Sequence, residues 1–375
     1  MLRSVTIKGY RGLEHFEMDK LGRINLLVGK NNSGKSSVLE AVYLLASGGA
    51  SQFFPALLDS RGEFLDHNPA DVMSRGQIPR MSIFDVRHLF HGHEFKDNAK
   101  ISIYSREHEP WQTIAIEIRN LQPEEIKRSS YEEEIRASRE EFRALEVSAK
   151  KNDILHSTRS IHLVTVRGGL LTRLLSEISF AAWELPLLPF PNVQNFPGYL
   201  IALWNSITLT PNEDRVVEAL QCVEPRIERI AVDVPTHPRT LSPRSGFKVK
   251  LNDQDKPLPI GSLGDGVWRM LAIAIMLVVS RDSVLLIDEI DTGLHYSVLE
   301  KLWHMVMKTA KDLNVQVFAT THSYDCVTSL ASICRAEPEA MSEVTIQRVE
   351  AGKRKAVAYD ESGIVMAAER HIEMR

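Results

Sequence analysis

The feature that most limits the fold of this chain is a phosphate-binding loop near its start. Residues 29–36 read Gly-Lys-Asn-Asn-Ser-Gly-Lys-Ser and fit the pattern G-x-x-x-x-G-K-[ST]. The apolar run Ile24–Val28, typical of a buried strand in an α/β sheet, precedes the loop, and a helix is predicted from about Lys35 to Leu45. A strand before the loop and a helix after it are the context in which this motif binds phosphate. The chain is therefore predicted to contain an α/β domain that binds a nucleotide.

The residues of this loop have distinct parts in phosphate binding. Glycines let successive backbone N–H groups point at the phosphates, and the helix N-terminus adds its partial positive charge. Lys35 is predicted to reach the β- and γ-phosphates, and the Ser36 hydroxyl to bind Mg²⁺. The other residues predicted to contact the nucleotide are Gly29, Asn31, Asn32, Ser33, Gly34, Ser37 and, from an earlier turn, Arg11. The predicted ligands are thus ATP and Mg²⁺.

Two later apolar strands are predicted to bring further chemistry to the same edge of the sheet. Val284–Ile287 ends at Asp288, which would lie beside the Mg²⁺, and at Glu289, which would accept a proton from an attacking water. A helix separates this strand from Val315–Ala319, so the two form a parallel crossover unit. His322 follows the second strand and is interpreted as a sensor of the γ-phosphate. A pair of surface acids and a structural histidine are the alternatives, and the nearby phosphate-binding loop disfavours both.

A second helix N-terminus is a candidate for binding the phosphate of another molecule. Residues 261–266 read Gly-Ser-Leu-Gly-Asp-Gly and precede a strongly helical segment, Val267–Ser280. A serine and glycines at a helix N-terminus can bind an anion through free N–H groups. Because the first loop already surrounds one side of a triphosphate, the second is predicted to serve a neighbouring copy. On spacing alone, a capped helix after a turn explains the segment equally well.

These four motifs, in the order in which they occur along the chain, resemble the ABC ATPase superfamily. The long separation between Gly34 and Gly264 resembles the RecF, SMC and OLD (overcoming lysogenisation defect) branch. Residues 7–12, Ile-Lys-Gly-Tyr-Arg-Gly, are similar to the opening F-R-G/S turn of that branch, with Tyr10 where Phe is usual. The segments most similar to OLD-type ATPases are 29–41, 262–266 and 288–295, and the resemblance as a whole covers roughly 1–50 and 257–330.

The resemblance implies an α/β fold: an ABC-type P-loop ATPase head with mixed and antiparallel sheets, plus an inserted, mainly helical lobe. It implies a core made of residues 1–119 and 251–375, with the inserted, signature-side lobe at 120–250. The OLD proteins usually carry a C-terminal Toprim nuclease domain. The segment 323–375 is too short for that domain, so none is expected in this sequence.

The resemblance also assigns roles to single residues. Ser262 and Gly264 correspond to the signature serine and its second glycine, which in the family touch the γ-phosphate of the opposing protomer in a head-to-tail dimer. Asp291 falls in the D-loop, which in the family couples the two sites. Gln77 is the best-placed candidate for the Q-loop glutamine. The residues expected to form the trans signature are Ser262, Gly264, Asp265 and Gly266, and those expected to be catalytic are Glu289, His322 and Lys35.

The middle of the chain is predicted to be mostly helical. About half of the residues in Pro123–Lys151 are charged, and apolar residues recur at spacings of four and three, which favours an amphipathic helix packed on its own domain. The proline-rich stretch Leu185–Pro197 is predicted to be loop. The other predicted elements are strands in 101–104, 113–118, 230–234 and 247–251 and helices in 199–207 and 213–223.

Composition excludes several classes of protein. A net charge of −4 argues against a broadly basic surface, so any contact with nucleic acid would be local. Leu271–Val279, the longest apolar stretch, is too short to span a bilayer, and the first residues do not resemble a secretory signal. Three cysteines without a CxxC pair indicate reduced thiols, and His88, His91 and His93 are interpreted as loop histidines rather than a metal site. We expect a soluble cytoplasmic protein that does not contact a membrane.

Three functions fit these features, all with a homodimer or a higher oligomer. The first is a stand-alone OLD-like ATPase that acts as a sensor or switch in phage defence with a separately encoded effector protein. The second is a DNA-maintenance ATPase like RecF, and the third is a structural hub whose nucleotide state sets oligomerisation. Strongly salt-dependent DNA binding would favour the second. A neighbouring gene for a nuclease or toxin would favour the sensor or switch. Intact nucleotide binding with little turnover would favour the structural hub.

Overall fold

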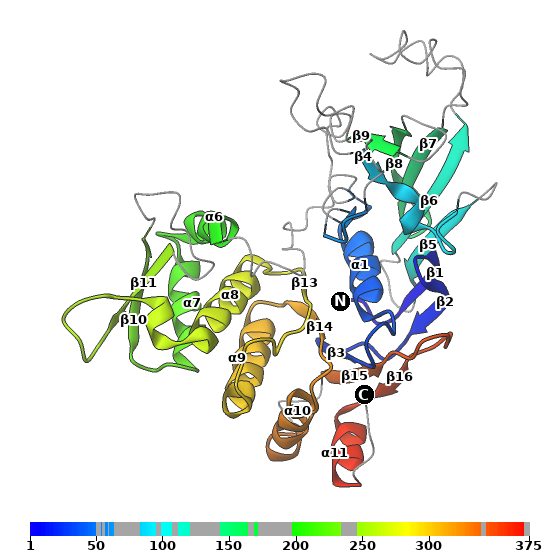
Figure 1. The fold of residues 1–375 in the computed structure, drawn as a ribbon. Helices are drawn as coiled ribbons and strands as arrows, with labels where there is room; N and C mark the ends of the chain where they lie inside the picture. The colour runs from blue at the N-terminus through cyan, green and yellow to red at the C-terminus, as the bar shows by residue number, and fades with distance from the viewer. Residues whose placement is uncertain are drawn as a thin grey trace, which may run out of the picture.

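The structure is a computed structural model, which describes most of the chain. The described residues are 1–49, 54, 57–58, 60–63, 83–94, 99–106, 112–120, 143–163, 169–171, 197–233, 246–338 and 343–370. They form a central parallel sheet with helices on one face and, on the other, a helix and a large antiparallel sheet (Figure 1). The termini of the parallel strands determine where the candidate site lies.

The central sheet has five strands in the order β13-β14-β3-β15-β16. Its strands are β3 (Ile24–Val28), β13 (Val284–Ile287), β14 (Gln316–Thr320), β15 (Val344–Arg348) and β16 (Val357–Tyr359). The first four in the order are parallel, and β16 pairs antiparallel with β15. Every residue of β3, β13 and β14 is buried, because elements cover the sheet on both faces. The predicted buried strands are therefore confirmed, and the carboxyl ends of β3, β13 and β14 share one edge.

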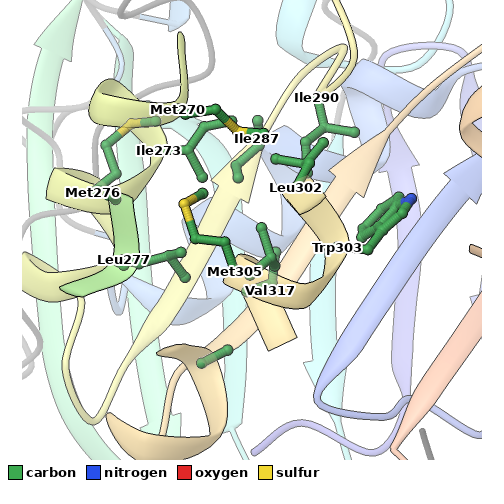
Figure 2. Close-up of a cluster of buried hydrophobic side chains, with 14 of the residues drawn as sticks. Met270, Ile273, Met276, Leu277, Ile287, Ile290, Leu302, Trp303, Met305 and Val317 are labelled. Atoms are coloured by element: carbon green, nitrogen blue, oxygen red, sulfur yellow. The ribbon is translucent and has the colours of Figure 1, made fainter. Parts of the chain in front are cut away.

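Alternate residues of these strands enter two different hydrophobic cores. Leu285 and Ile287 of β13 pack into one core, whereas Leu286 packs into the other. The first core contains α8 (Asp265–Val279), α9 (Leu299–Asp312), α10 (Tyr324–Ala336) and α11 (Glu361–Glu369). Figure 2 shows part of it, where side chains of α8 and α9 meet Ile287 and Val317. The second core contains α1 (Lys35–Ala46), the helix predicted after the phosphate-binding loop.

An antiparallel sheet covers α1 on its outer side (Figure 1). Its order is β2-β1-β5-β6-β7-β8. The strands are β1 (Val5–Tyr10), β2 (Leu13–Met18), β5 (Lys100–Ser105), β6 (Gln112–Asn120), β7 (Arg143–Lys151) and β8 (Ile154–Leu163). A short pair, β4 (Ile83–Asp85) with β9 (Gly169–Leu171), and the 3₁₀ turn η1 (Val86–Leu89) lie outside this sheet. Mixed and antiparallel sheets were predicted, and the α/β class is confirmed.

The helix expected over Pro123–Lys151 is wrong for its last nine residues, which form strand β7. Leu145, Val147 and Ala149 alternate along the strand and are buried, a period of two that the helical spacing concealed. Hydrogen bonding to β6 on one side and β8 on the other decides in favour of the strand. The rest of the predicted helix, the proline-rich loop up to residue 196, and Gln77 lie outside the described residues.

The expected inserted lobe at 120–250 also needs correction. Residues 143–163 belong to the same sheet as β1, so they continue the core. The later part contains α6 (Pro197–Ile207) and α7 (Pro211–Gln221) beside β10 (Ile227–Asp233) and β11 (Gly246–Leu251), so its described residues are mixed rather than mainly helical. Its core joins that of α8, where the Phe247 ring lies 6.0 Å from Trp204 and 5.7 Å from Trp268.

Each helix in the described part of the chain is too short or too polar to cross a lipid bilayer.

Candidate nucleotide-binding site

The phosphate-binding loop connects β3 to α1 and depends on glycine at two positions. Gly29 has φ 147°, and a Cβ atom there would lie 2.2 Å from the carbonyl oxygen of Val349. Gly34 has φ 101° and is the N-cap of α1 without a side-chain cap, so the N–H groups of the first helical turn remain available. The loop therefore has the backbone that an anion at this helix N-terminus requires.

Lys35 lies across the loop that precedes it. Its Nζ donates to the carbonyl oxygens of Gly29, at 2.7 Å, and of Lys30, at 2.9 Å. Burial lowers the pKa of Lys35, and the charges of Asp288 and Glu289 partly offset this effect. A triphosphate in the loop would offer stronger acceptors than two carbonyl groups, because hydrogen bonds between charged partners are about twice as strong as neutral ones.

Ser36 and Asp288 bring two oxygen ligands together from distant parts of the chain. Ser36 Oγ donates to Asp288 Oδ2 at 3.1 Å, and Thr320 Oγ1 donates to Asp288 Oδ1. Mg²⁺ prefers octahedral oxygen ligands at about 2.0–2.1 Å, which places adjacent ligands about 3 Å apart. The hydroxyl and the carboxylate therefore fit two adjacent positions around a Mg²⁺ ion, and their role as metal ligands stays a prediction from the sequence.

Glu289 has a left-handed backbone that hydrogen bonds hold on both sides. Its φ is 49°, a conformation that is unfavourable for a residue with a Cβ atom. Its N–H donates to Thr320 Oγ1 at 2.8 Å, and its carbonyl oxygen accepts from Arg269 Nη2 at 2.9 Å. These contacts turn the carboxylate away from the strand and toward the open edge of the sheet, where 54% of the side chain is exposed.

His322 lies beside Glu289 at that edge. Its Nδ1 is 3.7 Å from Glu289 Oε1, and about half of each side chain is exposed. Thr292 Oγ1 donates to the other carboxylate oxygen of Glu289 at 3.0 Å. A water in contact with Glu289 would therefore also be close to the imidazole, an arrangement that general-base chemistry on a phosphate can use.

Asp291 follows in the loop after β13 and is fixed to the next strand. Thr321 Oγ1 donates to Asp291 Oδ1 at 2.6 Å, and the Ile290 N–H donates to the Thr320 carbonyl oxygen at 3.0 Å. The structure thus brings together Lys35, Ser36, Asp288, Glu289, Asp291 and His322, which lie at the carboxyl ends of β13 and β14 or at the start of α1.

The helix after the signature segment starts two residues before the predicted Val267. Helix α8 begins at Asp265, and its N-cap is Gly264, with φ 94° and no side-chain cap. Ser262 lies before the helix, in the 3₁₀ turn η5 (Ile260–Leu263), and Gly264, with its left-handed backbone, separates this turn from the helix. The first turn of the helix thus contains the N–H groups of Asp265, Gly266 and the residue after them, and the Trp268 N–H donates to the Gly264 carbonyl oxygen at 3.4 Å.

The N-terminus of α8 lies against the loop that contains Asp291. A Cβ atom on Gly266 would be 3.6 Å from Leu294 Cδ2, an ordinary contact. Asp265 is exposed in the first turn of α8, where its negative charge interacts favourably with the helix dipole. The segment therefore presents the start of a helix beside the loop of its own chain that contains Asp291.

Arg11 is buried and bound to acidic side chains. Its Nε donates to Glu40 Oε2 and its Nη1 to Glu63 Oε1, both at 2.5 Å, and the Tyr10 hydroxyl donates to the same Glu40 oxygen at 2.8 Å. Burial lowers the pKa of Arg11, but the charges of Tyr10 and Glu40 and the hydrogen bond with Glu63 outweigh it, so the pKa rises. Arg11 is therefore a permanent cation in this cluster.

A cavity of about 410 Å³ lies between this cluster and the phosphate-binding loop. Arg11, Asn32, Ser33, Ser37 and Glu63 are among its lining residues, and Lys353 and Arg354 line it as well. Arg11 Nη2, Ser33 Oγ and Glu63 Oε2 are buried and have no hydrogen-bond partner among the residues that the structure describes. Buried polar atoms without partners are costly, so the cavity is suited to a polar ligand.

The remaining candidates are ordinary loop contacts. His88 Nδ1 lies 3.2 Å from His93 Nδ1, and His91 Nδ1 lies 2.9 Å from the Arg11 carbonyl oxygen. Within the described ranges, His, Cys, Asp and Glu side chains do not form a group of three that could hold a metal ion.

The sequence reasoning missed Thr320 and Arg269. Both lie close to residues that were predicted, and Arg269 gives a signal, since it is the only charged residue of α8 after Asp265. A buried cation in such a helix requires a specific set of acceptors.

A protein family and several known proteins are similar to this chain. A family model described as "AAA domain, putative AbiEii toxin, Type IV TA system" matches residues 24–325. A protein of Helicobacter pylori named ATP/GTP phosphatase is 23% identical over 355 residues, which is 89% of this chain and 89% of that protein. The DNA replication and repair protein RecF of Yersinia pseudotuberculosis is 36% identical over 77 residues, 20% of each chain. The SMC head domain from Thermotoga maritima aligns with a TM-score of 0.46 and 11% identity, covering 96% of this chain and 98% of that one.

Proposed function

The chain belongs to the AAA_21 family of P-loop ATPases, and from that premise we propose that it hydrolyses ATP with Mg²⁺ in a site shared by two copies. The observation that carries the proposal is the connected set of contacts from Ser36 through Asp288 and Thr320 to Glu289 and His322. It joins a metal-binding pair to a base at one edge of the sheet.

Within one chain, separate residues would bind the triphosphate, hold the metal ion and accept the proton. The N–H groups of the loop from Gly29 to Ser37 and the Lys35 ammonium bind the triphosphate. Ser36 and Asp288 hold Mg²⁺, which supplies positive charge to the β- and γ-phosphate oxygens when bound. Glu289 accepts a proton from the attacking water, and His322 contacts the γ-phosphate.

The cavity beside Asn32 and Ser37 would take the nucleoside. Asn32, Ser33, Gly34 and Ser37 of the loop line it, and the polar atoms of Arg11 and Glu63 that have no partner among the described residues offer both donors and acceptors to a base or a ribose. Arg11 would thus line the nucleotide site while bound to Glu40. Because the Helicobacter pylori relative is named for both ATP and GTP, the two nucleotides should be compared directly.

The second half of each site would come from a partner copy. The start of α8 exposes Gly264 and Asp265, and the N–H groups in the first turn of a helix can bind an anion. In a head-to-tail pair, two such helices would each face the γ-phosphate of the opposing copy, and Asp291 would couple the sites. An isologous contact of this kind gives a closed dimer with two-fold symmetry, which could build a higher oligomer.

The cellular role we favour is an OLD-like sensor or switch in phage defence that acts with a separately encoded effector. The family description names a putative toxin of a toxin–antitoxin system, which supports a role in defence. A RecF-like role in DNA maintenance is the second candidate, supported by the similarity of 77 residues to RecF. Binding of duplex DNA that weakens steeply with salt would favour RecF-like activity.

Co-expressed variants test the shared site. Lys35→Ala disables the triphosphate half of one chain, and Gly266→Asp places a negative charge where the partner's γ-phosphate would bind. An acidic residue near its N-terminus stabilises a helix, so the Gly266→Asp protein should fold. Each variant alone should be inactive, and the purified heterodimer should regain one working site. Gly266→Ala is the matched control, because its methyl group makes only an ordinary contact.

The outcomes separate the parts of the proposal. Normal ATP hydrolysis by Gly266→Asp alone, or a heterodimer no more active than its parents, would refute the shared site. Glu289→Gln should keep binding of MgATP and lose turnover, since the amide keeps the shape and cannot accept the proton. Wild-type chains that bind MgATP without turnover would point instead to a structural hub.

A further inference from the structure

Arg269 is a buried cation in an otherwise apolar part of α8. Only 6% of the residue is exposed, and its neighbours along the helix pack into the first hydrophobic core. Burial lowers the pKa of Arg269 to about 10, and the charges of Asp291, Glu289 and Asp288 partly offset the effect. A buried charge is costly unless it is hydrogen-bonded, so Arg269 requires acceptors close to its guanidinium.

Two of its contacts are with main-chain carbonyl groups of the acidic residues at the end of β13. Arg269 Nη2 donates to the Glu289 carbonyl oxygen at 2.9 Å and lies 3.4 Å from the Asp288 carbonyl oxygen. The guanidinium therefore contacts the main chain of these two residues. Their carboxylates point elsewhere, that of Asp288 to Ser36 and that of Glu289 to Thr292.

The contact acts on a strained residue. Glu289 has φ 49°, which a residue with a Cβ atom adopts only where the surroundings compensate. Thr320 holds the N–H of Glu289, and Arg269 holds its carbonyl group. If the second hydrogen bond were lost, the peptide could rotate toward a relaxed conformation and carry the carboxylate away from His322.

We propose that Arg269 is a positioning residue, which holds Glu289 in its left-handed conformation and links it to the helix that meets the partner's phosphate. The inference rests on the proposed function. Arg269 lies four residues, about one helical turn, after Asp265, where α8 begins. A shift of α8 on contact with the partner's γ-phosphate would therefore move the guanidinium and, through it, the Glu289 peptide.

Arg269→Met tests the first half of the inference in the full-length chain. The thioether side chain fills the space without donating a hydrogen bond. We expect kcat for ATP to fall about 10- to 100-fold, since a displacement of about 1 Å at a reacting group costs on the order of 100-fold. The Kd for MgATP should stay within about twofold, because the Arg269 hydrogen bonds to Glu289 and Asp288 involve carbonyl groups after β13 and not the phosphate-binding loop. Arg269→Lys, which can still donate to one carbonyl group, should regain part of the loss.

Arg23→Met is the matched control. Arg23 also binds an acid and a carbonyl group, Glu343 at 2.6 Å and Ala310 at 3.4 Å, but at the other end of the parallel sheet. Its loss should cost stability without changing kcat. If Arg269→Met keeps kcat within twofold of wild type, or loses kcat and MgATP affinity in parallel, the positioning role is wrong. If the wild type itself does not hydrolyse ATP, the proposed function fails first.

The heterodimer separates positioning from simple support of α8. In the pair of Gly266→Asp with Lys35→Ala, the working site uses the Glu289 of the Gly266→Asp chain and the α8 start of the Lys35→Ala chain. Arg269→Met added to the Gly266→Asp chain should therefore remove the regained activity. Added to the Lys35→Ala chain, Arg269→Met should leave the regained activity intact, because the Glu289 of that chain belongs to the site that is already inactive. Loss of activity only in the second arrangement would show that Arg269 merely shapes α8 and would overturn the proposal.

Discussion

Replacing Thr320 with valine would remove one hydroxyl that organises the site. Thr320 is fully buried at the end of β14, and its Oγ1 donates to Asp288 and accepts from the Glu289 N–H at 2.8 Å. Valine has almost the same shape as threonine, so Thr320→Val leaves both partners without that hydrogen bond and creates little empty space. Thr320→Ser is the matched variant, since it keeps the hydroxyl and loses only a methyl group.

The expected costs follow from those two contacts. A hydrogen bond to a charged group contributes about 1.5–3 kcal/mol, and a buried N–H without a partner costs about 1–3 kcal/mol. Asp288 keeps its contact with Ser36, so we expect Thr320→Val to lower the free energy of unfolding by about 2–4 kcal/mol, below the sum of the two. Thr320→Ser should lower it by about 1 kcal/mol, the value of one buried methyl group.

Activity should separate the two variants further. Without the hydroxyl, Asp288 and Glu289 both lose their alignment, so kcat should fall on the order of 100-fold in Thr320→Val and only a few-fold in Thr320→Ser. Urea unfolding followed by circular dichroism gives the stability, and steady-state ATP hydrolysis gives kcat. A Thr320→Val protein as active as Thr320→Ser would refute the view that this hydroxyl aligns the site.

Two further predictions concern the loop and the buried thiols. Lys35→Ala should weaken binding of MgATP by about 10- to 150-fold, the loss of one or two charge-assisted hydrogen bonds, and unchanged affinity by calorimetry would contradict the assignment of the loop. Burial raises the pKa of Cys334 to about 11 and raises that of Cys326 further, so both thiolates are scarce below that pH. In the folded protein at pH 8, iodoacetamide should label the partly exposed Cys222 first, and the buried pair only after unfolding in urea. Rapid labelling of Cys334 under native conditions would be inconsistent with this packing.

The sequence by itself determined those features that depend on neighbouring residues. A buried parallel strand needs a short apolar run, and a phosphate-binding loop needs glycines at fixed spacing before a helix, so β3, the loop and α1 were predictable. Asp288 and Glu289 directly follow the apolar run of β13, and parallel strands share one carboxyl edge. Their meeting with Ser36 could therefore be inferred without coordinates.

Only the tertiary structure decided the features that depend on distant partners. Arg143–Lys151 fits both a helix and a strand locally, and pairing with β6 and β8 selects the strand. The start of α8 at Asp265, two residues before the predicted Val267, follows from the backbone conformation of Gly264, where φ is 94°. Thr320 and Arg269 join the site because the fold brings β14 and α8 to the end of β13, 31 and 20 residues away along the chain. Contacts of that kind arise from packing, and no periodicity or spacing in the sequence encodes them.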